Sequence, residues 1–133
     1  TRMSKTSHYA LVVLAYLASR PAERVQASQV AHDTRIPHNY LSKVLNQLRK
    51  QGFVWGRKGW GGGYQLRAEA AQRPLIDIVQ IFDGSDQTAS CLCRLGHCDP
   101  DNPCPLHPSW SAINTDYHRL LVQMTIADIV PLP

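Results

Sequence analysis

The sequence predicts a mainly α-helical protein with one small β-hairpin, and three patterns support this fold class. Apolar residues recur at intervals of three and four along several stretches, which places them on one face of an α-helix. A glycine-rich turn separates two short runs of β-prone residues, as in a hairpin. All four cysteines lie between Cys91 and His107, where frequent prolines favour a loop. The 133 residues suffice for one domain or a compact unit of two lobes.

The composition favours an ordinary globular protein. Hydrophobic residues make up 44% of the chain, and no apolar run approaches the roughly 20 residues that a membrane span needs. The first residues lack a convincing cleavage site for a signal peptide. We therefore expect a cytoplasmic protein that does not associate with a membrane. In that reducing compartment, clustered thiols more often bind a metal or take part in redox chemistry than form structural disulfides.

Charge divides the chain into two parts, residues 1–73 and residues 74–133. The first part has twelve Lys and Arg against three Asp and Glu, a net charge of +9, and the second has two against seven, a net charge of −5, which together give the +4 of the whole chain. A basic region of this kind favours a polyanionic partner such as nucleic acid. A solvated basic surface without such a partner is the alternative.

Two helices are expected early in the basic part. The first has an apolar stripe at helical spacing and ends near Arg20 and Pro21. The second is short, and Ser28 is its expected N-cap. The stripe residues are Ala10, Val13, Leu14 and Leu17 in the first helix and Val30 and Ala31 in the second.

A third helix is expected to carry the polar face that meets nucleic acid. It follows a turn at Ile36 and Pro37, because the residue before a proline avoids helical angles, and it runs from His38 to a stop at Gly52. Its apolar stripe consists of Leu41, Val44, Leu45 and Leu48. Its other sides present amides, hydroxyls and a cation, which suit base edges and phosphates. We predict DNA contacts from His38, Asn39, Tyr40, Ser42, Lys43 and Gln47.

A basic β-hairpin is expected to follow this helix. Its arms are residues 53–55 and 64–66, and its tip is expected to carry Arg57 and Lys58. Gly61 and Gly62 allow the backbone to approach a phosphate closely. Helix, turn, polar-faced helix and basic hairpin, in this order, predict a winged helix-turn-helix. This fold places its recognition helix in the major groove of double-stranded DNA and its wing along the backbone or the minor groove.

The acidic part is expected to supply a dimerisation helix. Pro74 is expected to open one helix, and Gly84 to end it. A longer amphipathic helix follows the cysteines, from about Trp110 to Met124, and "TIAD" at residues 125–128 can form a capping box. The apolar face of the longer helix exceeds what one small lobe covers, so we predict a homodimer that reads paired half-sites. Packing of that face within one chain is the alternative.

The cysteine-rich loop, at about residues 91–108, is expected to bind a metal or a cluster. Structural zinc sites usually use paired C-x2-C motifs, and none occurs here. Spread cysteines on a loop suit an iron–sulfur cluster, whose ligands are mainly thiolates. A zinc-stabilised DNA-binding module and a thiol–disulfide switch are the alternatives. No catalytic pair of nucleophile and base is legible, so we do not expect an enzyme. The soft ligands on offer are Cys91, Cys93, Cys98, Cys104 and His107.

The chain contains the stretches "HYALVVLAYLA", "NYLSKVLNQLRKQGFV", "GWGGGY" in the wing and "TIADIV", together with the cysteines Cys93, Cys98 and Cys104. With these features it resembles the Rrf2 family of bacterial winged-helix regulators over nearly its whole length. This resemblance implies a homodimeric transcriptional regulator, such as a repressor. Its affinity for DNA would follow the state of a [2Fe-2S] or [4Fe-4S] cluster that responds to redox, nitric oxide or iron–sulfur status.

The resemblance also implies a ligand set. Cys93, Cys98 and Cys104 match the three cluster cysteines of the family, and His107 matches a histidine ligand found in some members. His8 falls where other members place a carboxylate ligand from the partner subunit, so it is the alternative fourth ligand. Cys91 is an extra thiol and is interpreted as spare.

Overall fold

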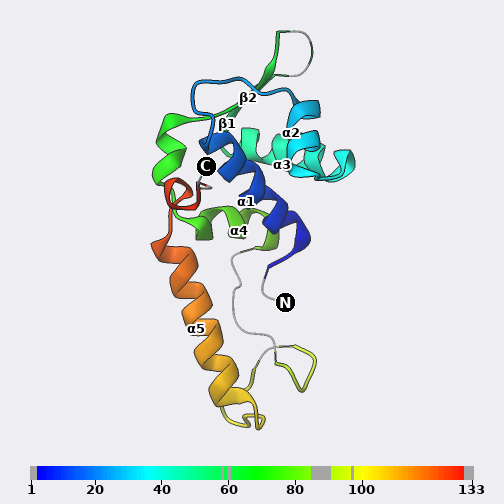
Figure 1. Cartoon of the computed structure of the whole chain (residues 1–133). Helices are drawn as coiled ribbons and strands as arrows, with labels where there is room; N and C mark the ends of the chain where they lie inside the picture. Colours follow the sequence, from blue (N-terminus) through cyan, green and yellow to red (C-terminus); the bar gives the residue numbers. More distant parts are fainter. Residues whose placement is uncertain (1–2, 58, 60, 85–90, 97, 131–133) are drawn as a thin grey trace.

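A computed structural model describes residues 3–57, 59, 61–84, 91–96 and 98–130 of the chain. In chain order it contains α1 (Lys5–Ala18), α2 (Ala27–Thr34), α3 (His38–Lys50), β1 (Val54–Arg57), β2 (Gly63–Leu66), the 3-10 helix η1 (Ala68–Gln72), α4 (Leu75–Asp83), α5 (His107–Gln123) and the 3-10 helix η2 (Ile126–Ile129). The two strands pair in antiparallel orientation. The mainly helical fold with one hairpin, predicted from the sequence, is confirmed (Figure 1).

The helix α1 lies at the centre of the fold and packs against α2, α3, α4 and η2. Its predicted apolar stripe is confirmed, because all four side chains are fully buried. The predicted stripe of α3 is confirmed as well, since each of its four side chains is at most 1% exposed. Full burial of a Leu or Val side chain contributes about 1.5–3 kcal/mol, so these two stripes hold the three-helix unit together.

The helix α2 begins earlier than the sequence suggested, and Ser28 is not its N-cap. The N-cap is Gln26, whose side chain makes no capping hydrogen bond. The preceding residue, Val25, exchanges two backbone hydrogen bonds with Tyr64 of β2, at 2.9 and 2.8 Å. This bridge holds Val25 in an extended conformation, so the helix starts soon after it. The Gln26 Nε2 atom donates to the Gly62 carbonyl at 3.1 Å, which joins α2 to the hairpin.

The hairpin extends further toward its turn than predicted. Phe53 precedes β1 and is fully buried, and Arg57 is the last residue of β1 instead of a tip residue. Arg57 pairs with Gly63, which adopts a φ of 132° that favours glycine. The ladder therefore continues two residues beyond Trp55, the last arm residue predicted.

The helix α5 projects away from the other elements, and its C-terminal end is tied to the start of α4. The Leu75 amide donates to the Met124 carbonyl at 2.9 Å, and the Ile126 amide donates to the Arg73 carbonyl at 3.1 Å. The predicted capping box is present, with the Thr125 amide donating to the Asp128 carboxylate at 2.9 Å. In Figure 1 the N-terminal end of α5 and the cysteine-rich loop lie at the opposite end of the molecule from the hairpin.

The helix α4 begins after Pro74 and ends before Gly84, as predicted. Its residues Ile78 and Val79 are fully buried and join the same core as α1 and α3. The division of the chain after residue 73, which follows the change in charge, stays a prediction. None of the helices in the described ranges is long and apolar enough to cross a membrane.

Candidate nucleic-acid interface and cysteine segment

The face of α3 opposite its buried stripe is exposed and polar. The helical repeat of 100° per residue places Asn39, Lys43, Asn46 and Lys50 along this face, and all four are exposed. His38 and Ser42, also predicted to contact DNA, are exposed beside it. Side chains that accept and donate hydrogen bonds, with one cation among the first two turns, suit the edges of bases in the major groove. The predicted contacts of these residues with DNA stay predictions.

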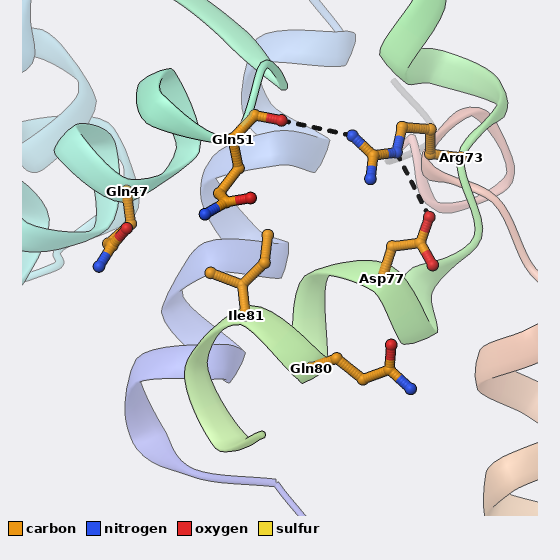
Figure 2. A pocket seen from close by; sticks show the side chains of 6 residues that line it. All are labelled: Gln47, Gln51, Arg73, Asp77, Gln80 and Ile81. Carbon is orange, nitrogen blue, oxygen red and sulfur yellow. Dashed lines mark hydrogen bonds and ion pairs between the residues drawn. The ribbon is translucent and has the colours of Figure 1, made fainter. Parts of the chain in front are cut away.

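Two of the predicted DNA-contacting residues lie on the flank of α3 that faces α1 and α4. The Tyr40 ring is half-buried and packs edge-on against Tyr9 of α1, with ring centroids 5.2 Å apart. Gln47 lines a cavity of about 380 Å³ between α3 and α4, together with Gln51, Arg73, Asp77, Gln80 and Ile81 (Figure 2). Tyr40 therefore packs against a neighbouring helix, whereas Gln47 is exposed and borders the cavity, and sequence periodicity alone did not separate either residue from Asn39 and Lys43.

Arg73 connects the end of α3 to α4 across this cavity. Its Nε atom lies 3.3 Å from the Asp77 carboxylate, and its Nη1 atom donates to the Gln51 carbonyl at 3.5 Å (Figure 2). The guanidinium also lies over the Phe53 ring, 3.9 Å from its centroid. One side chain thus contacts the C-cap of α3, the residue before β1 and the first turn of α4.

The turn of the hairpin uses the two predicted glycines differently. Gly62 is buried, its amide donates to the Gly59 carbonyl at 3.0 Å, and a Cβ atom there would collide with the Arg57 carbonyl oxygen. Gly61 is exposed and has a φ of +70°. The hairpin therefore requires Gly62 for its own closure, whereas Gly61 presents accessible backbone. Lys58, predicted at the tip, lies outside the described residues.

A feature missed in the sequence is the turn residue Arg35. It follows α2 as its C-cap in the left-handed conformation, with φ 62° and ψ 22°. Its amide donates to the Ala31 carbonyl at 2.9 Å, which ends the helix. Glycine usually occupies such a position because a Cβ atom is strained there. A basic side chain in this place carries positive charge into the turn that precedes α3.

Polar side chains fix α2 against α1 on the surface. The Asp33 carboxylate accepts hydrogen bonds from Gln29 Nε2 at 2.8 Å and from the Tyr16 hydroxyl at 2.5 Å. The bonds from Gln29, Tyr16 and His32 lower the pKa of Asp33 to about 2. Burial and the bond to Asp33 raise the pKa of Tyr16 to about 12. Both shifts mean that the contact holds the carboxylate ionised and the phenol protonated.

Cys104 interacts with two other thiols of the cysteine-rich loop. Cys104 is buried, Cys91 is half-buried and Cys93 is exposed. Burial acts to raise the pKa of Cys104, but hydrogen bonds from the Leu106 amide and from the thiols of Cys93 and Cys91 outweigh it and lower that pKa. The hydrogen bond to Cys104 is the main reason why the pKa of Cys93 is raised. Cys91, interpreted as spare from the sequence, therefore contacts Cys104 as Cys93 does.

The other predicted ligands lie at different places. Cys98 is half-buried in the same loop. His107 is the first residue of α5, and its amide donates to the Cys104 carbonyl at 3.0 Å, which links the backbone of the two residues. His8 is exposed in the second turn of α1. Within the part of the chain that the structure describes, no three His, Cys, Asp or Glu side chains have the arrangement of a single metal-ion site.

The helix α5 keeps part of its apolar stripe exposed in the single chain. Leu121 is the one buried side chain of this helix and is 2% exposed. Ile113 and Leu120 are 54% and 53% exposed, and half-buried Trp110 and Tyr117 lie on the same face. Packing within the chain, the alternative to dimerisation, covers Leu121 and part of Tyr117 and Met124, and it leaves Ile113 and Leu120 exposed.

The chain is similar to known transcription regulators over almost its whole length. A candidate HTH-type transcriptional regulator of Aquifex aeolicus (strain VF5) is 33% identical over 129 residues, which cover 96% of this chain and 90% of that protein. The HTH-type transcriptional regulator NsrR of Shouchella clausii (strain KSM-K16) is 29% identical over 131 residues, which cover 97% of this chain and 88% of NsrR.

The fold is similar to a solved structure as well. CymR (YrzC), the global cysteine regulator of B. subtilis, superposes with a TM-score of 0.76 at 22% sequence identity, over 98% of this chain and 96% of that chain. The family Rrf2, described as "Iron-dependent Transcriptional regulator", matches residues 3–131. The predicted resemblance is thereby confirmed, and the chain belongs to the Rrf2 family of transcriptional regulators.

Proposed function

We propose that this transcriptional regulator binds its operator through α3 and the hairpin, and that an iron–sulfur cluster in the cysteine-rich loop sets its affinity for DNA. The observation that carries the proposal is the burial of Cys104 directly before α5, where its carbonyl accepts a hydrogen bond from the His107 amide at 3.0 Å, in a loop that also holds Cys93 and Cys98. Thiolates are the main ligands of iron–sulfur clusters, so the chemistry of this donor set fits such a group. The family description, which names iron dependence, supports the same choice of metal.

In this proposal Cys93, Cys98 and Cys104 hold the cluster, and His107 or His8 of the partner subunit supplies the fourth ligand. A bound cluster supplies redox and nitric-oxide chemistry. The residues of the chain supply the coupling: His107 is at once next to Cys104 and the first residue of α5. Ligation of His107 would fix the loop to the helix proposed to form the dimer. Ligation of His8 would instead connect the loop to the first helix of the opposite subunit.

The proposed homodimer uses the outer face of α5. Its exposed Ile113 and Leu120 form an apolar surface that a second copy of the same helix can cover. A dimer presents two copies of α3, as the reading of paired half-sites requires. A change in DNA affinity of tenfold needs only about 1.4 kcal/mol of difference between the two conformations of such a dimer.

A thiol–disulfide switch is the second candidate function. The contact of Cys104 with both Cys91 and Cys93 favours it, because thiols already in contact need little movement to be joined. This switch would need an oxidant of the peroxide or disulfide class to accept the two electrons that the thiols lose. A zinc-stabilised module stays the third possibility from the sequence.

Analysis of anaerobically purified protein for iron, acid-labile sulfide and zinc distinguishes the three candidates. We expect coloured protein with iron and sulfide, and loss of the colour in Cys104→Ala. Cys91→Ala is the matched control, since it removes a neighbouring thiol that the proposed ligand set does not use. Colour retained in Cys104→Ala contradicts the proposal. Zinc alone supports the zinc module, and the absence of metal and sulfide supports the thiol switch.

The fourth ligand is tested by His107→Ala and His8→Ala under the same conditions. The variant that removes the ligand should change both the absorption spectrum of the cluster and the affinity for the operator. If both variants keep the spectrum and the affinity of the unmodified protein, neither histidine is a ligand.

A further inference from the structure

A second cavity lies between the C-terminal half of α3 and the hairpin. It has a volume of about 300 Å³ and is lined by Asn46, Arg49, Gly56, Arg57 and Tyr64. It opens beside the exposed polar face of α3, because Asn46 belongs to both. The DNA-contacting residues predicted from the sequence include Arg57 but not Arg49. The sequence alone does not show that these two arginines line the same cavity.

The floor of this cavity depends on a glycine. Gly56 lies directly opposite Tyr64 in the strand register. A Cβ atom on Gly56 would lie 2.5 Å from Cδ1 and Cε1 of the Tyr64 ring, so only glycine allows the ring to lie where it does. The φ of Gly56 is not in the left-handed region, and the reason for glycine here is therefore space. The stem of Arg49 approaches the same point, since its Cδ atom would lie 3.5 Å from that Cβ atom.

The wall of the cavity holds positive charge that no acidic group in the described ranges neutralises. Arg49 Nη2 donates to Asn46 Oδ1 at 2.9 Å, which directs the guanidinium without changing its charge. Among the described residues, no carboxylate lies within 4.0 Å of the guanidinium of Arg49 or Arg57. Two guanidinium groups on one recess repel each other, and an anion between them relieves this repulsion. Guanidinium forks match phosphate oxygens in geometry and in charge.

We propose that this recess binds one phosphodiester group of the DNA backbone, held by Arg49 and Arg57 and bordered by Asn46 and Tyr64. The proposal rests on the proposed binding of DNA by α3 and the hairpin, and it names a contact between these two elements. Such a contact fixes the position of α3 along the duplex and carries no sequence information itself. In this proposal Arg49 contacts the phosphate backbone of the DNA, whereas the first two turns of the same helix contact the bases.

The test is the salt dependence of DNA binding, measured by fluorescence anisotropy with an operator duplex and with a scrambled duplex. Loss of one phosphate contact should reduce the magnitude of the slope of the logarithm of the association constant against the logarithm of the salt concentration by about 0.9. Raising the salt fourfold should then weaken Arg49→Ala about 3.5-fold less than it weakens the unmodified protein. The two duplexes should be affected alike, because the contact does not read sequence.

Two further variants sharpen the test. Arg119→Ala removes the same charge from an exposed part of α5 outside its apolar stripe, and it should leave the slope unchanged. Gly56→Ala changes no charge but moves the Tyr64 ring, so it should weaken both duplexes if the recess is the binding site. Circular dichroism of each variant verifies that the fold is retained. If Gly56→Ala does not fold, the salt slope of Arg49→Ala alone tests the proposal, since this substitution alters an exposed side chain.

The outcomes separate this inference from the proposed function. Unmodified protein that binds neither duplex overturns both. Unmodified protein that binds DNA while Arg49→Ala keeps its slope and affinity overturns the phosphate recess alone. If orthophosphate raises the melting temperature of the unmodified protein and of Arg119→Ala but not that of Arg49→Ala, while DNA binding is unaffected, the recess takes a free anion and the DNA assignment is overturned.

Discussion

The helical lobe, formed by α1 to α4 and the hairpin, differs from the cysteine segment, residues 91–106, in how its side chains are buried. In the lobe, Leu14, Leu45 and Phe53 are at most 1% exposed. In the described part of the cysteine segment, Cys104 is the one buried residue, and Leu95 is fully exposed. The backbone hydrogen bonds found there join near neighbours in sequence, as between Cys91 and Gly96 at 2.9 Å.

This difference shows that the two regions obtain their conformation from different sources. The lobe is held by an apolar core, to which Leu121 of α5 and Ile126 of η2 also contribute. The cysteine segment has little apolar burial to offset the entropy of ordering its backbone. A bound group or a partner subunit would supply the missing free energy, and the conformation of the segment would then depend on whether that group is present.

The difference between the two regions is tested first by a substitution in the core of the lobe, where the largest loss of stability is expected. Leu45→Ala should lower the free energy of unfolding by about 2–5 kcal/mol, because it leaves a cavity in a fully packed site. Leu95→Ala, the same substitution in the cysteine segment, should change it by no more than about 0.5 kcal/mol. Urea denaturation followed by circular dichroism measures both. Similar losses in the two variants would mean that the segment belongs to the folding core.

A smaller effect on stability is expected at Ser7, a buried polar residue of the lobe. Ser7 is fully buried in α1, and no described group forms a hydrogen bond with its Oγ atom. Ser7→Ala should therefore raise the free energy of unfolding by about 1 kcal/mol, since it removes a buried polar group that has no partner.

Ser4→Ala is the matched control for Ser7→Ala. The Ser4 Oγ atom accepts a hydrogen bond from the Ser7 amide at 3.1 Å and caps α1. Its loss should cost about 1 kcal/mol in the opposite direction. Urea denaturation again gives both values, and a destabilised Ser7→Ala would show that its hydroxyl has a partner in solution.

The smallest expected effect concerns pH. Hydrogen bonds from Gln29, Tyr16 and His32 lower the pKa of Asp33 from 3.8 to about 2. A lowered pKa in the folded state means that the contribution of Asp33 to stability is fully present above about pH 4 and is lost as the pH falls toward about 2. Melting temperatures of the unmodified protein and of Asp33→Asn should differ slightly at neutral pH and converge near about pH 2. A difference that is constant over this range would contradict the assigned shift.

The helices could be predicted because their signals are local. The buried stripes of α1 and α3 recur at the helical period, and Pro74 and Gly84 mark the ends of α4 in the sequence itself. The start of α2 could not be found in this way. It depends on the bridge between Val25 and Tyr64, residues that lie far apart in the chain. Where a distant contact fixes a boundary, the nearest favourable capping residue is a poor guide.

The sequence predicted the exposed polar face of α3, but it did not predict what borders this face on either side. Asn39 and Lys43 are exposed on α3 as the periodicity required. Gln47 belongs to the same polar set, but the position of α4 turns its surroundings into a cavity that also contains Arg73. Arg49, on the other flank of α3, lines a recess with Gly56, Arg57 and Tyr64 of the hairpin, and its binding of phosphate stays a proposal. The tertiary arrangement of α3, α4 and the hairpin decides these roles, and no local pattern contains it.

The hairpin owes its orientation to the residues just before α2. A two-stranded hairpin alone is marginally stable in water. Here Tyr64 exchanges two backbone hydrogen bonds with Val25, and Gln26 holds the Gly62 carbonyl. These contacts hold the hairpin to the start of α2, and the hairpin shares a recess with Asn46 and Arg49 of α3. If the proposed dimer binds DNA through α3 and the hairpin, a signal that left each lobe unchanged would alter the distance and the angle between the two lobes. The spacing of the half-sites, more than their sequence, would then be the property of DNA that the signal selects.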